Sequence, residues 1–376
     1  MVGLIKITYI IDQFIGRLGG TENQLLKLIR GLDKNKFQVQ LVSLDGTDWL
    51  QKNASLFECE CKMLSINRTD KLSTYVNYFK LIKYLQTYKA DVVHTFFPLS
   101  NSLCVMAAKV AGVKNIVSSR RDYGEWMNNK YLIATRLANL AVKKIVVNAQ
   151  SVKDLTKMME KVSDDKIQVI LNGIDTSLYQ SVHQDYDLKK VLQIPDRNKV
   201  IGIIANFREM KHHHIFIQAA HKMLKTRQDI SFILIGGGSR ESHIKALAES
   251  LKIANNVWFC GQQEDVIPYL SIMDVGINCS KREGLSNAVM EYMATGVPCV
   301  VSDAGGNTDL ITHDVNGYVF ALDDYQTLAH LSLKLLADAQ TRGKFIAKAR
   351  EKIEQEMSME KMIGKYETLY ENLVAK

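Results

Sequence analysis

The 376-residue sequence predicts an α/β protein with two parallel sheets in two tandem domains. Short apolar runs alternate with stretches of helical periodicity, which is typical of a parallel sheet whose strands are connected by helices. The alternation forms two series that meet near residues 177–187. The chain is also longer than one hydrophobic core usually supports, and this favours two domains.

The first series predicts six strands separated by helices, because each short apolar run is followed by a longer amphipathic stretch. The predicted strands are residues 5–11, 39–44, 92–94, 115–118, 144–148 and 167–171. The predicted helices are residues 22–32, 72–88, 103–110, 131–141 and 151–161.

The second series repeats this pattern. Its predicted strands are residues 200–205, 231–235, 257–260, 275–279, 299–302 and 318–320. Its predicted helices are residues 214–224, 241–251, 266–273, 286–295 and 325–337. A last helix near residues 357–374 has no strand after it. Because parallel α/β domains bind ligands at the carboxyl ends of their strands, we expect the functional residues in the strand-to-helix loops.

The composition is that of a globular protein, with 47% hydrophobic and 23% charged residues. No apolar run approaches the 18 residues of a membrane span, and the N-terminus has neither a basic segment nor a small-residue cleavage site. The six cysteines include no CxxC pair, and Cys59 and Cys61 alternate in a predicted strand. Buried, reduced thiols in a cytoplasmic protein are therefore expected.

Positive charge is concentrated in the first half of the chain. Residues 1–180 hold 25 Lys and Arg against 16 Asp and Glu, whereas the rest holds 23 against 24. This surplus predicts an anionic partner, either a membrane surface or a phosphate-bearing acceptor, although an ordinary solvated surface is an alternative. Nucleic acid is disfavoured because the basic residues lack interleaved aromatic side chains.

Residues 283–291, EGLSNAVME, are the most informative stretch. Glu283 and Glu291 would lie about two turns apart if the segment were helical, so both carboxylates could point the same way. Gly284 permits close backbone approach, and Ser286 or Asn287 can cap a helix whose N-terminus attracts an anion. We expect a phosphate at the start of this helix and sugar hydroxyls at the carboxylates. The alternative is an amphipathic helix with solvent-facing carboxylates.

A basic loop, ANFREMK, follows the first strand of the second series. Arg208 and Lys211 lie three residues apart, and a guanidinium beside an ammonium suits a diphosphate. The three histidines at 212–214 predict a loop-to-helix transition rather than a metal site, because adjacent side chains point in different directions. No HExxH or paired CxxC pattern occurs, so no metal is expected.

Other strand-end loops add weaker signals. Gly19 and Gly20 lie in a glycine-rich turn after the first strand, and Gly237 lies after the second strand of the second series; each permits close approach of a phosphate or forms a flexible turn. Asp265 either caps a helix or contacts a base. The stretch 303–307, DAGGN, is a further such loop.

The first half contributes two polar strand ends. His94 ends one strand, where it either serves the site or is a buried, satisfied histidine. Arg120, Arg121 and Asp122 end another, where the guanidinium groups can bind an anion and the carboxylate can orient a hydroxyl.

With these residues assembled, the chain resembles the family 4 glycosyltransferases of the GT-B fold over nearly its full length. The matching stretches are GGTE (19–22), DVVH (91–94), SSRRD (118–122), VILNGID (169–175), ANFREMK (205–211), LIGGG (234–238), VWFCGQQEDV (257–266) and EGLSNAVMEYMATGVPCVVSDAGGNTDLI (283–311). The last block is highly specific.

The resemblance implies two Rossmann-like domains with parallel sheets that face each other across a cleft. Residues 1–180 would bind the acceptor and residues 181–356 the nucleotide sugar, while the helix 357–376 would pack back on the first domain. It implies a metal-independent hexosyltransferase that retains the anomeric configuration and moves a sugar from a UDP- or GDP-sugar to a lipid-linked or glycan hydroxyl. The protein would be cytoplasmic, or peripheral on the inner face of the plasma membrane.

The resemblance also implies roles for single residues. Glu291 would hold the ribose and Glu283 the donor sugar, while Arg208 and Lys211 would neutralise the diphosphate. His94 would lie near the reacting sugar. The diphosphate would also be met by N–H groups near Gly284, Leu285 and Ser286 and by the turn of Gly19 and Gly20. Asn287 would belong to the same donor-binding site.

Two departures from the family pattern are visible. Many members have a second histidine where this chain has Phe96, and if that second imidazole is the useful one, His94 is structural. Many also place their arginine and lysine five residues apart, whereas Arg208 and Lys211 are three apart. A sugar-nucleotide epimerase of the same fold and a non-catalytic sugar-nucleotide-binding protein are the alternatives. A dehydrogenase is disfavoured, because GxGxxG is missing after the first strand.

Overall fold

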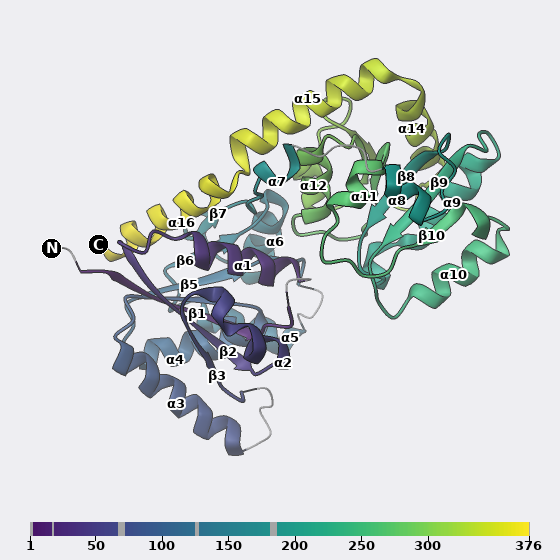
Figure 1. The fold of residues 1–376 in the computed structure, drawn as a ribbon. Helices are drawn as coiled ribbons and strands as arrows, with labels where there is room; N and C mark the ends of the chain where they lie inside the picture. The colour runs from purple at the N-terminus through teal and green to yellow at the C-terminus, as the bar shows by residue number, and fades with distance from the viewer. Residues whose placement is uncertain (1–2, 17–18, 67–71, 125–127, 181–185, 376) are drawn as a thin grey trace. The chain divides into compact units, whose positions relative to one another are not determined.

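The computed structural model describes residues 3–16, 19–66, 72–124, 128–180 and 186–375. By its internal contacts the chain divides into two compact units (Figure 1). The N-terminal unit comprises Met1–Gly173 and Glu360–Lys376, and the C-terminal unit comprises Ile174–Met359. The predicted seam at 177–187 includes residues 181–185, which lie outside the described residues.

The N-terminal unit is built on a seven-stranded parallel sheet in the order β3-β2-β1-β4-β5-β6-β7. Its strands are β1 (Ile5–Gln13), β2 (Phe37–Asp45), β3 (Glu60–Met63), β4 (Val92–Phe96), β5 (Asn115–Arg120), β6 (Lys144–Val147) and β7 (Ile167–Val169). Ile7 of β1 pairs with Val39 on one side and with Val92 on the other, so the strand order reverses between β1 and β4. Ligands of parallel α/β sheets bind at such a reversal.

Helices cover both faces of this sheet (Figure 1). They are α1 (Gly20–Gly31), α2 (Asp48–Asn53), α3 (Leu72–Tyr88), α4 (Val105–Val110), α5 (Asn129–Ala138) and α6 (Gln150–Glu160), with shorter turns at Ala54–Phe57, Ser100–Cys104 and Asp164–Lys166. Helices α3 to α6 follow right-handed crossovers that run in one direction across the sheet, so they share one face, and α1 lies on the other.

The last helix, α16 (Met359–Val374), packs beside α1. A Cβ on Gly31 would come within 2.1 Å of Ile363, so the missing side chain makes room for α16. The backbone N–H of Asp33 donates to Glu367 at 2.9 Å, and the hydroxyl of Tyr370 meets that of Tyr9 at 2.9 Å. The helix thereby completes the core of the N-terminal unit.

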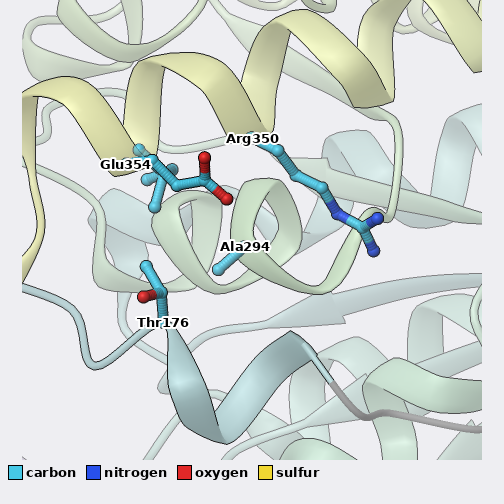
Figure 2. A pocket seen from close by; sticks show the side chains of 5 residues that line it. Thr176, Ala294, Arg350 and Glu354 are labelled. Atoms are coloured by element: carbon cyan, nitrogen blue, oxygen red, sulfur yellow. The ribbon is translucent and has the colours of Figure 1, made fainter.

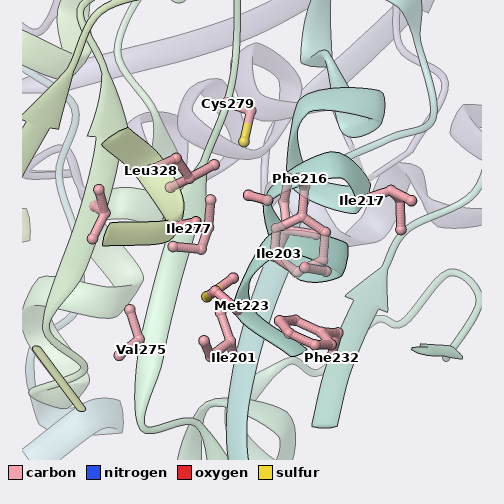
Figure 3. Packing of buried hydrophobic residues seen from close by; sticks show 14 of the residues in the cluster. Ile201, Ile203, Phe216, Ile217, Met223, Phe232, Val275, Ile277, Cys279 and Leu328 are labelled. Carbon is pink, nitrogen blue, oxygen red and sulfur yellow. The ribbon is translucent and has the colours of Figure 1, made fainter. Parts of the chain in front are cut away.

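The C-terminal unit contains a six-stranded parallel sheet in the order β10-β9-β8-β11-β12-β13. Its strands are β8 (Lys199–Ile204), β9 (Ile230–Ile235), β10 (Val257–Phe259), β11 (Val275–Asn278), β12 (Cys299–Ser302) and β13 (Tyr318–Phe320). The order reverses between β8 and β11, where Ile203 pairs with Ile277. Figure 3 shows both residues in the hydrophobic core beneath α9, among Phe216, Phe232 and Leu328.

The helices of this unit are α7 (Ser177–Gln180), α8 (Tyr186–Val191), α9 (His213–Leu224), α10 (Glu241–Ser250), α11 (Ile267–Ile272), α12 (Asn287–Thr295), α13 (Gly306–Leu310), α14 (Tyr325–Ala337) and α15 (Ala339–Glu356), with short turns at Glu209–Lys211 and Ala254–Asn256. Helix α15 was not predicted. Only Phe345, Ala349 and Ile353 of its 18 residues are buried, so its apolar stripe is too thin to produce a clear periodicity. In the described part of the chain, no helix is long and apolar enough to cross a membrane.

Candidate nucleotide-sugar site

Two loops meet where the strand order of the C-terminal unit reverses. One follows β8 and the other follows β11, and the backbone N–H of Lys281 donates to the carbonyl of Met210 at 2.8 Å. The ammonium of Lys211 donates to Oε2 of Glu283 at 2.5 Å, and the hydroxyl of Ser280 donates to the same oxygen at 2.8 Å. The structure therefore brings Lys211 and Glu283 together, although 72 residues separate them.

Arg208 stands at the start of the short turn Glu209–Lys211, in extended backbone conformation with φ −109°. Its side chain is exposed. Among the residues that the structure describes, none forms a hydrogen bond or ion pair with this guanidinium. A cation without a partner, three residues from Lys211, can receive an anion without first breaking a contact.

The helix after Glu283 begins at Asn287, one residue after its predicted start. Ser286 is the N-cap of α12, and its hydroxyl accepts from the N–H of Val289 at 3.3 Å, which confirms one of the two predicted caps. Glu283 precedes the helix, as the predicted start at residue 286 implies, so the two-turn separation that a fully helical segment would give does not apply to Glu283 and Glu291. Glu291 is half-buried on α12 itself. Glu283 thus lies in the loop before α12, whereas Glu291 lies within the helix.

A buried network that sequence reasoning missed holds this loop. The side chain of Asn278 donates to the hydroxyl of Ser286 at 2.9 Å and accepts from the N–H of Ser280 at 2.9 Å. The hydroxyl of Ser302 donates to the carbonyl of Ser280 at 2.6 Å, and Asn307 donates to Ser302 and Asn278. The sequence did contain one signal for this network. Asn278 and Ser302 are polar residues at the ends of buried apolar strands, where a polar side chain needs a hydrogen-bond partner.

Gly306 allows the loops after β11 and β12 to touch. The N–H of Gly306 donates to the carbonyl of Glu283 at 2.9 Å. A Cβ on Gly306 would lie 1.7 Å from the carbonyl oxygen of Gly284, which no real side chain could tolerate. The loop 303–307 therefore fixes the backbone of Gly284 and Leu285, both buried, just before the α12 N-terminus.

Gly237 and Asp265 lie in neighbouring loops of the same unit. The carbonyl of Gly237 accepts from the N–H of Phe207 at 2.9 Å, so its loop is packed against the segment that leads to Arg208. Asp265 lies just before Val266, the N-cap of α11, and its Oδ1 accepts from the N–H of Ile267 at 2.9 Å. Burial raises the pKa of the Tyr179 hydroxyl, and the charges of Glu291 and Asp265 raise it further.

The glycine turn of the N-terminal unit leads directly into α1. Gly19 is the N-cap of α1, and a Cβ there would lie 2.0 Å from Oε2 of Glu22. A carboxylate at this position of a helix resembles a capping box, in which it neutralises the helix terminus. Gly20 is exposed in the first turn. Residues 17–18 of this turn lie outside the described residues, and a phosphate contact here stays a prediction.

His94 is fully buried in β4, with both imidazole nitrogens occupied. Nδ1 lies 2.8 Å from the hydroxyl of Tyr370 and Nε2 lies 2.8 Å from that of Ser119. Burial lowers the pKa of His94 well below its ordinary value, and the nearby Arg121 guanidinium lowers it further. These contacts favour the structural interpretation of His94.

Arg120, Arg121 and Asp122, at the end of β5 and just after it, lie in different environments. Arg120 is buried and forms a forked pair with Glu160, at 2.6 Å and 2.9 Å. Arg121 donates to Asn172 and to the hydroxyl of Tyr366, whereas its Nε is buried without a partner. Asp122 is exposed and accepts from the N–H of Gly124 at 2.8 Å. Arg120 is thus fully engaged within the N-terminal unit, whereas Arg121 is half-buried and Asp122 is exposed.

The three adjacent histidines mark the transition from loop to helix, as predicted, because α9 begins at His213. His213 stacks on Phe207 with ring centroids 4.5 Å apart, and burial lowers the pKa of its imidazole to about 4. His212 and His214 lie near Asp323. Asp323 is more than 100 residues away, so no local spacing could have revealed this cluster.

A small pocket lies at the opposite end of α12 (Figure 2). Thr176, Ala294, Arg350 and Glu354 line it. The guanidinium of Arg350 donates to the carbonyl of Thr295 at 2.7 Å, so it caps the C-terminal end of α12. A cation at that end stabilises the helix, which explains Arg350 without a ligand.

Comparisons with known proteins identify the fold and the family of the chain. The HepE protein of Anabaena, crystallised in complex with UDP, superposes with a TM-score of 0.86 at 18% identity, over 98% of this chain and 100% of its own. Residues 18–178 match the profile of Glycosyltransferase Family 4, and residues 185–352 match that of Glycosyl transferases group 1.

Two curated relatives carry enzyme names. The N-acetyl-alpha-D-glucosaminyl L-malate synthase of Bacillus anthracis is 28% identical over 77% of each chain. The UDP-Gal:alpha-D-GlcNAc-diphosphoundecaprenol alpha-1,3-galactosyltransferase of Escherichia coli is 24% identical over 98% of this chain and 97% of its own.

Two parallel-sheet, Rossmann-like units define a protein of the GT-B fold, and the chain is a glycosyltransferase. More particularly, it belongs to the group 1, or family 4, glycosyltransferases.

Proposed function

We propose that the C-terminal unit binds a UDP- or GDP-sugar and that the enzyme transfers the sugar, with retention and without a metal, to a lipid-linked or glycan hydroxyl. The observation that carries the proposal is the convergence of Lys211, Glu283 and the α12 N-terminus at the reversal between β8 and β11. Such a place combines cations for a diphosphate with a carboxylate for hydroxyls.

Each group has a chemical task in this proposal. The departing nucleoside diphosphate gains negative charge, and Arg208 and Lys211 stabilise that charge in place of a divalent ion. Glu283 accepts hydrogen bonds from the donor sugar, while Glu291 holds the ribose. The guanidinium of Arg208 is exposed and has no partner among the described residues, which supports this assignment. Backbone N–H groups from Gly284 onward assist at the start of α12.

No protein nucleophile is assigned. The half-buried carboxylate of Glu283 already accepts from Lys211 and Ser280, which favours binding over attack on a sugar carbon. The acceptor hydroxyl approaches the face from which the diphosphate leaves, and its proton passes to the departing phosphate. This route keeps the anomeric configuration and needs no further base.

A melting-temperature screen with UDP, GDP, ADP and their common sugar conjugates tests the donor assignment. A ligand that binds only the folded protein raises the melting temperature by mass action. We expect one nucleotide to raise it in the wild type and in Lys199→Ala, but less in Lys211→Ala. No shift with any nucleotide would contradict the proposed donor class. Release of free sugar from the donor without any acceptor would instead favour the epimerase alternative.

We further propose that the N-terminal unit rests on an anionic membrane, where a lipid-linked acceptor is found. Helices α3, α4 and α5, on one face of its sheet, carry large apolar side chains in contact with solvent. These are Tyr75, Val76, Phe79, Met106, Val110, Ile133 and Leu137, with exposed fractions from 43% to 67%, and Leu140, just after α5, is 83% exposed. Exposed lysines accompany them at 80, 83, 109, 130 and 143. An apolar face among lysines suits an anionic bilayer surface.

Sedimentation with vesicles tests this surface. We expect binding to vesicles with anionic phospholipid at low salt, weaker binding at high salt, and little binding to purely zwitterionic vesicles. Phe79→Glu with Leu137→Glu should abolish it. Val191→Glu, at an equally exposed apolar residue of the C-terminal unit, is the matched control. Equal binding of both variants would overturn the assignment of this face.

A further inference from the structure

His212, His214 and Asp323 form a cluster with metal-ligating atoms that the glycosyl transfer does not use. One nitrogen of each imidazole and one oxygen of the carboxylate all lie within 4.8 Å of one another. The two histidines flank the first residue of α9, and Asp323 lies in the turn that precedes α14. The cluster therefore joins the starts of two helices that pack side by side.

Nδ1 of His212 is the most buried of the atoms in this cluster that can bind a metal. The residue is 7% exposed, and this nitrogen is buried without a hydrogen-bond partner. It nevertheless lies 3.2 Å from Oδ1 of Asp323. The two atoms lie within ion-pair distance, so either a proton on this nitrogen or a shared cation can bridge them. An unpartnered buried nitrogen is unfavourable, and a shared cation would satisfy both atoms.

The spacing suits a transition-metal ion. Bonds of about 2.1 Å in a tetrahedral arrangement place ligand atoms roughly 3.4 Å apart. The distance between His212 and Asp323 already agrees with this value. His214 is half-buried and Asp323 is exposed, so both side chains can move to close the remaining distances.

The backbone also holds the cluster in place. His212 has φ +48° and Asp323 has φ +67°, a left-handed conformation that non-glycine residues rarely adopt. Such conformations occur where the surrounding structure or a function requires them. His212 adopts this conformation where the turn Glu209–Lys211 ends and α9 begins, and Asp323 adopts it just before the N-cap of α14.

We propose that His212, His214 and Asp323 bind a divalent transition-metal ion such as Zn²⁺, with water in the fourth position. Two imidazoles and one carboxylate form a ligand set that zinc accepts, whereas Mg²⁺ prefers oxygen ligands. The ion would connect the turn that carries Lys211 to the turn before α14. Its role is structural, because the sugar transfer proposed above needs no metal.

The test is a Zn²⁺ titration of protein without a polyhistidine tag, after dialysis against a chelator. We expect one Zn²⁺ site that is lost, or weakened at least about tenfold, in His214→Ala and in Asp323→Asn. His330→Ala, which removes an exposed histidine outside the cluster, should bind as the wild type does. Mg²⁺ should not compete.

Substitution of Co²⁺ for Zn²⁺ separates this site from the cysteines. Cys59 and Cys61 are half-buried and free, so a thiolate site would show sulfur-to-cobalt charge-transfer absorption. The proposed site should show only the visible bands of tetrahedral nitrogen and oxygen ligation. Equal Zn²⁺ affinity in the wild type and in His214→Ala combined with Asp323→Asn would overturn the proposal. Both variants should melt like the wild type in chelator, because neither side chain is fully buried.

Discussion

Lys211 and Glu283 form an ion pair across the carboxyl ends of β8 and β11, and Lys199 and Asp274 form a second pair across the amino ends of the same strands. The first pair is 2.5 Å long and the second is 2.9 Å long. Both pairs join the same two strands, but only the first lies at the end of the sheet where parallel α/β proteins bind ligands. The second pair is therefore a control for the first.

Removing the first pair should impair transfer with the fold intact. We expect Lys211→Ala to lower kcat by about 10²–10³-fold, because a group that stabilises charge in the transition state is lost. Arg208→Ala should act in the same direction without lowering the melting temperature, since its side chain is exposed. Lys199→Ala removes the control pair and should leave kcat within about twofold. Steady-state rates on a nucleotide-sugar donor measure all three, and equal loss in Lys199→Ala would contradict the assignment.

Arg120 should matter for stability rather than for acceptor binding. Its buried pair with Glu160 has side chains only 4% and 1% exposed. Breaking a buried pair leaves one unpaired charge, which costs about 3–5 kcal/mol. Urea unfolding should show this loss in Arg120→Ala, whereas Arg120→Met combined with Glu160→Leu should recover much of it. An Arg120→Ala protein of native stability but raised acceptor KM would instead restore the acceptor role.

A methyl group at Gly306 should disturb the site loop. Because its Cβ would lie 1.7 Å from the carbonyl oxygen of Gly284, one of the two loops must move. We expect Gly306→Ala to weaken nucleotide binding at least tenfold, measured by calorimetry. Gly343→Ala is the control, since its Cβ meets nothing within 4 Å in the exposed part of α15. That change should stabilise the protein by about 0.5–1 kcal/mol. Unchanged nucleotide affinity in Gly306→Ala would show that the contact is not needed.

Acid should destabilise the protein, in part through His94. Its pKa is lowered in the folded state, so the unfolded chain binds the proton more readily. The free energy of unfolding is therefore unaffected by this group above about pH 6.5 and falls as the pH decreases below it, by up to about 1.4 kcal/mol per pH unit. His94→Gln should fall less steeply between pH 7 and 5, whereas His330→Gln should keep the wild-type slope. Parallel slopes in urea titrations of His94→Gln and the wild type would refute the assignment.

Removal of metal by a chelator should affect the stability of the protein but not the rate of sugar transfer. We expect removal of metal to lower the melting temperature of the wild type but not that of Asp323→Asn. The transfer rate at 25 °C should stay within about twofold, because Arg208 and Lys211 take the place of a divalent ion at the diphosphate. Loss of turnover that added Mg²⁺ restores would contradict metal-independent transfer.

The sequence predicted the strands and the chemistry of the loops well. Twelve predicted strands match strands of the two sheets with ends that differ by two residues or fewer, because buried parallel strands are short apolar runs that periodicity identifies directly. The polar residues that end those strands were also visible. Helix α15 escaped because its exposed surface dominates its composition. The start of α12 was placed one residue early, since both Ser286 and Asn287 can cap a helix.

The sequence by itself determined the fold class, the family and the residues Arg208, Lys211 and Glu283 as candidates, because these follow from local pattern. The tertiary structure alone decided which candidates meet. It placed Lys211 against Glu283 and enclosed both nitrogens of His94, and it brought Asp323 to His212 across more than 100 residues. The physical reason is that strand order and helix packing, rather than spacing along the chain, determine which side chains become neighbours.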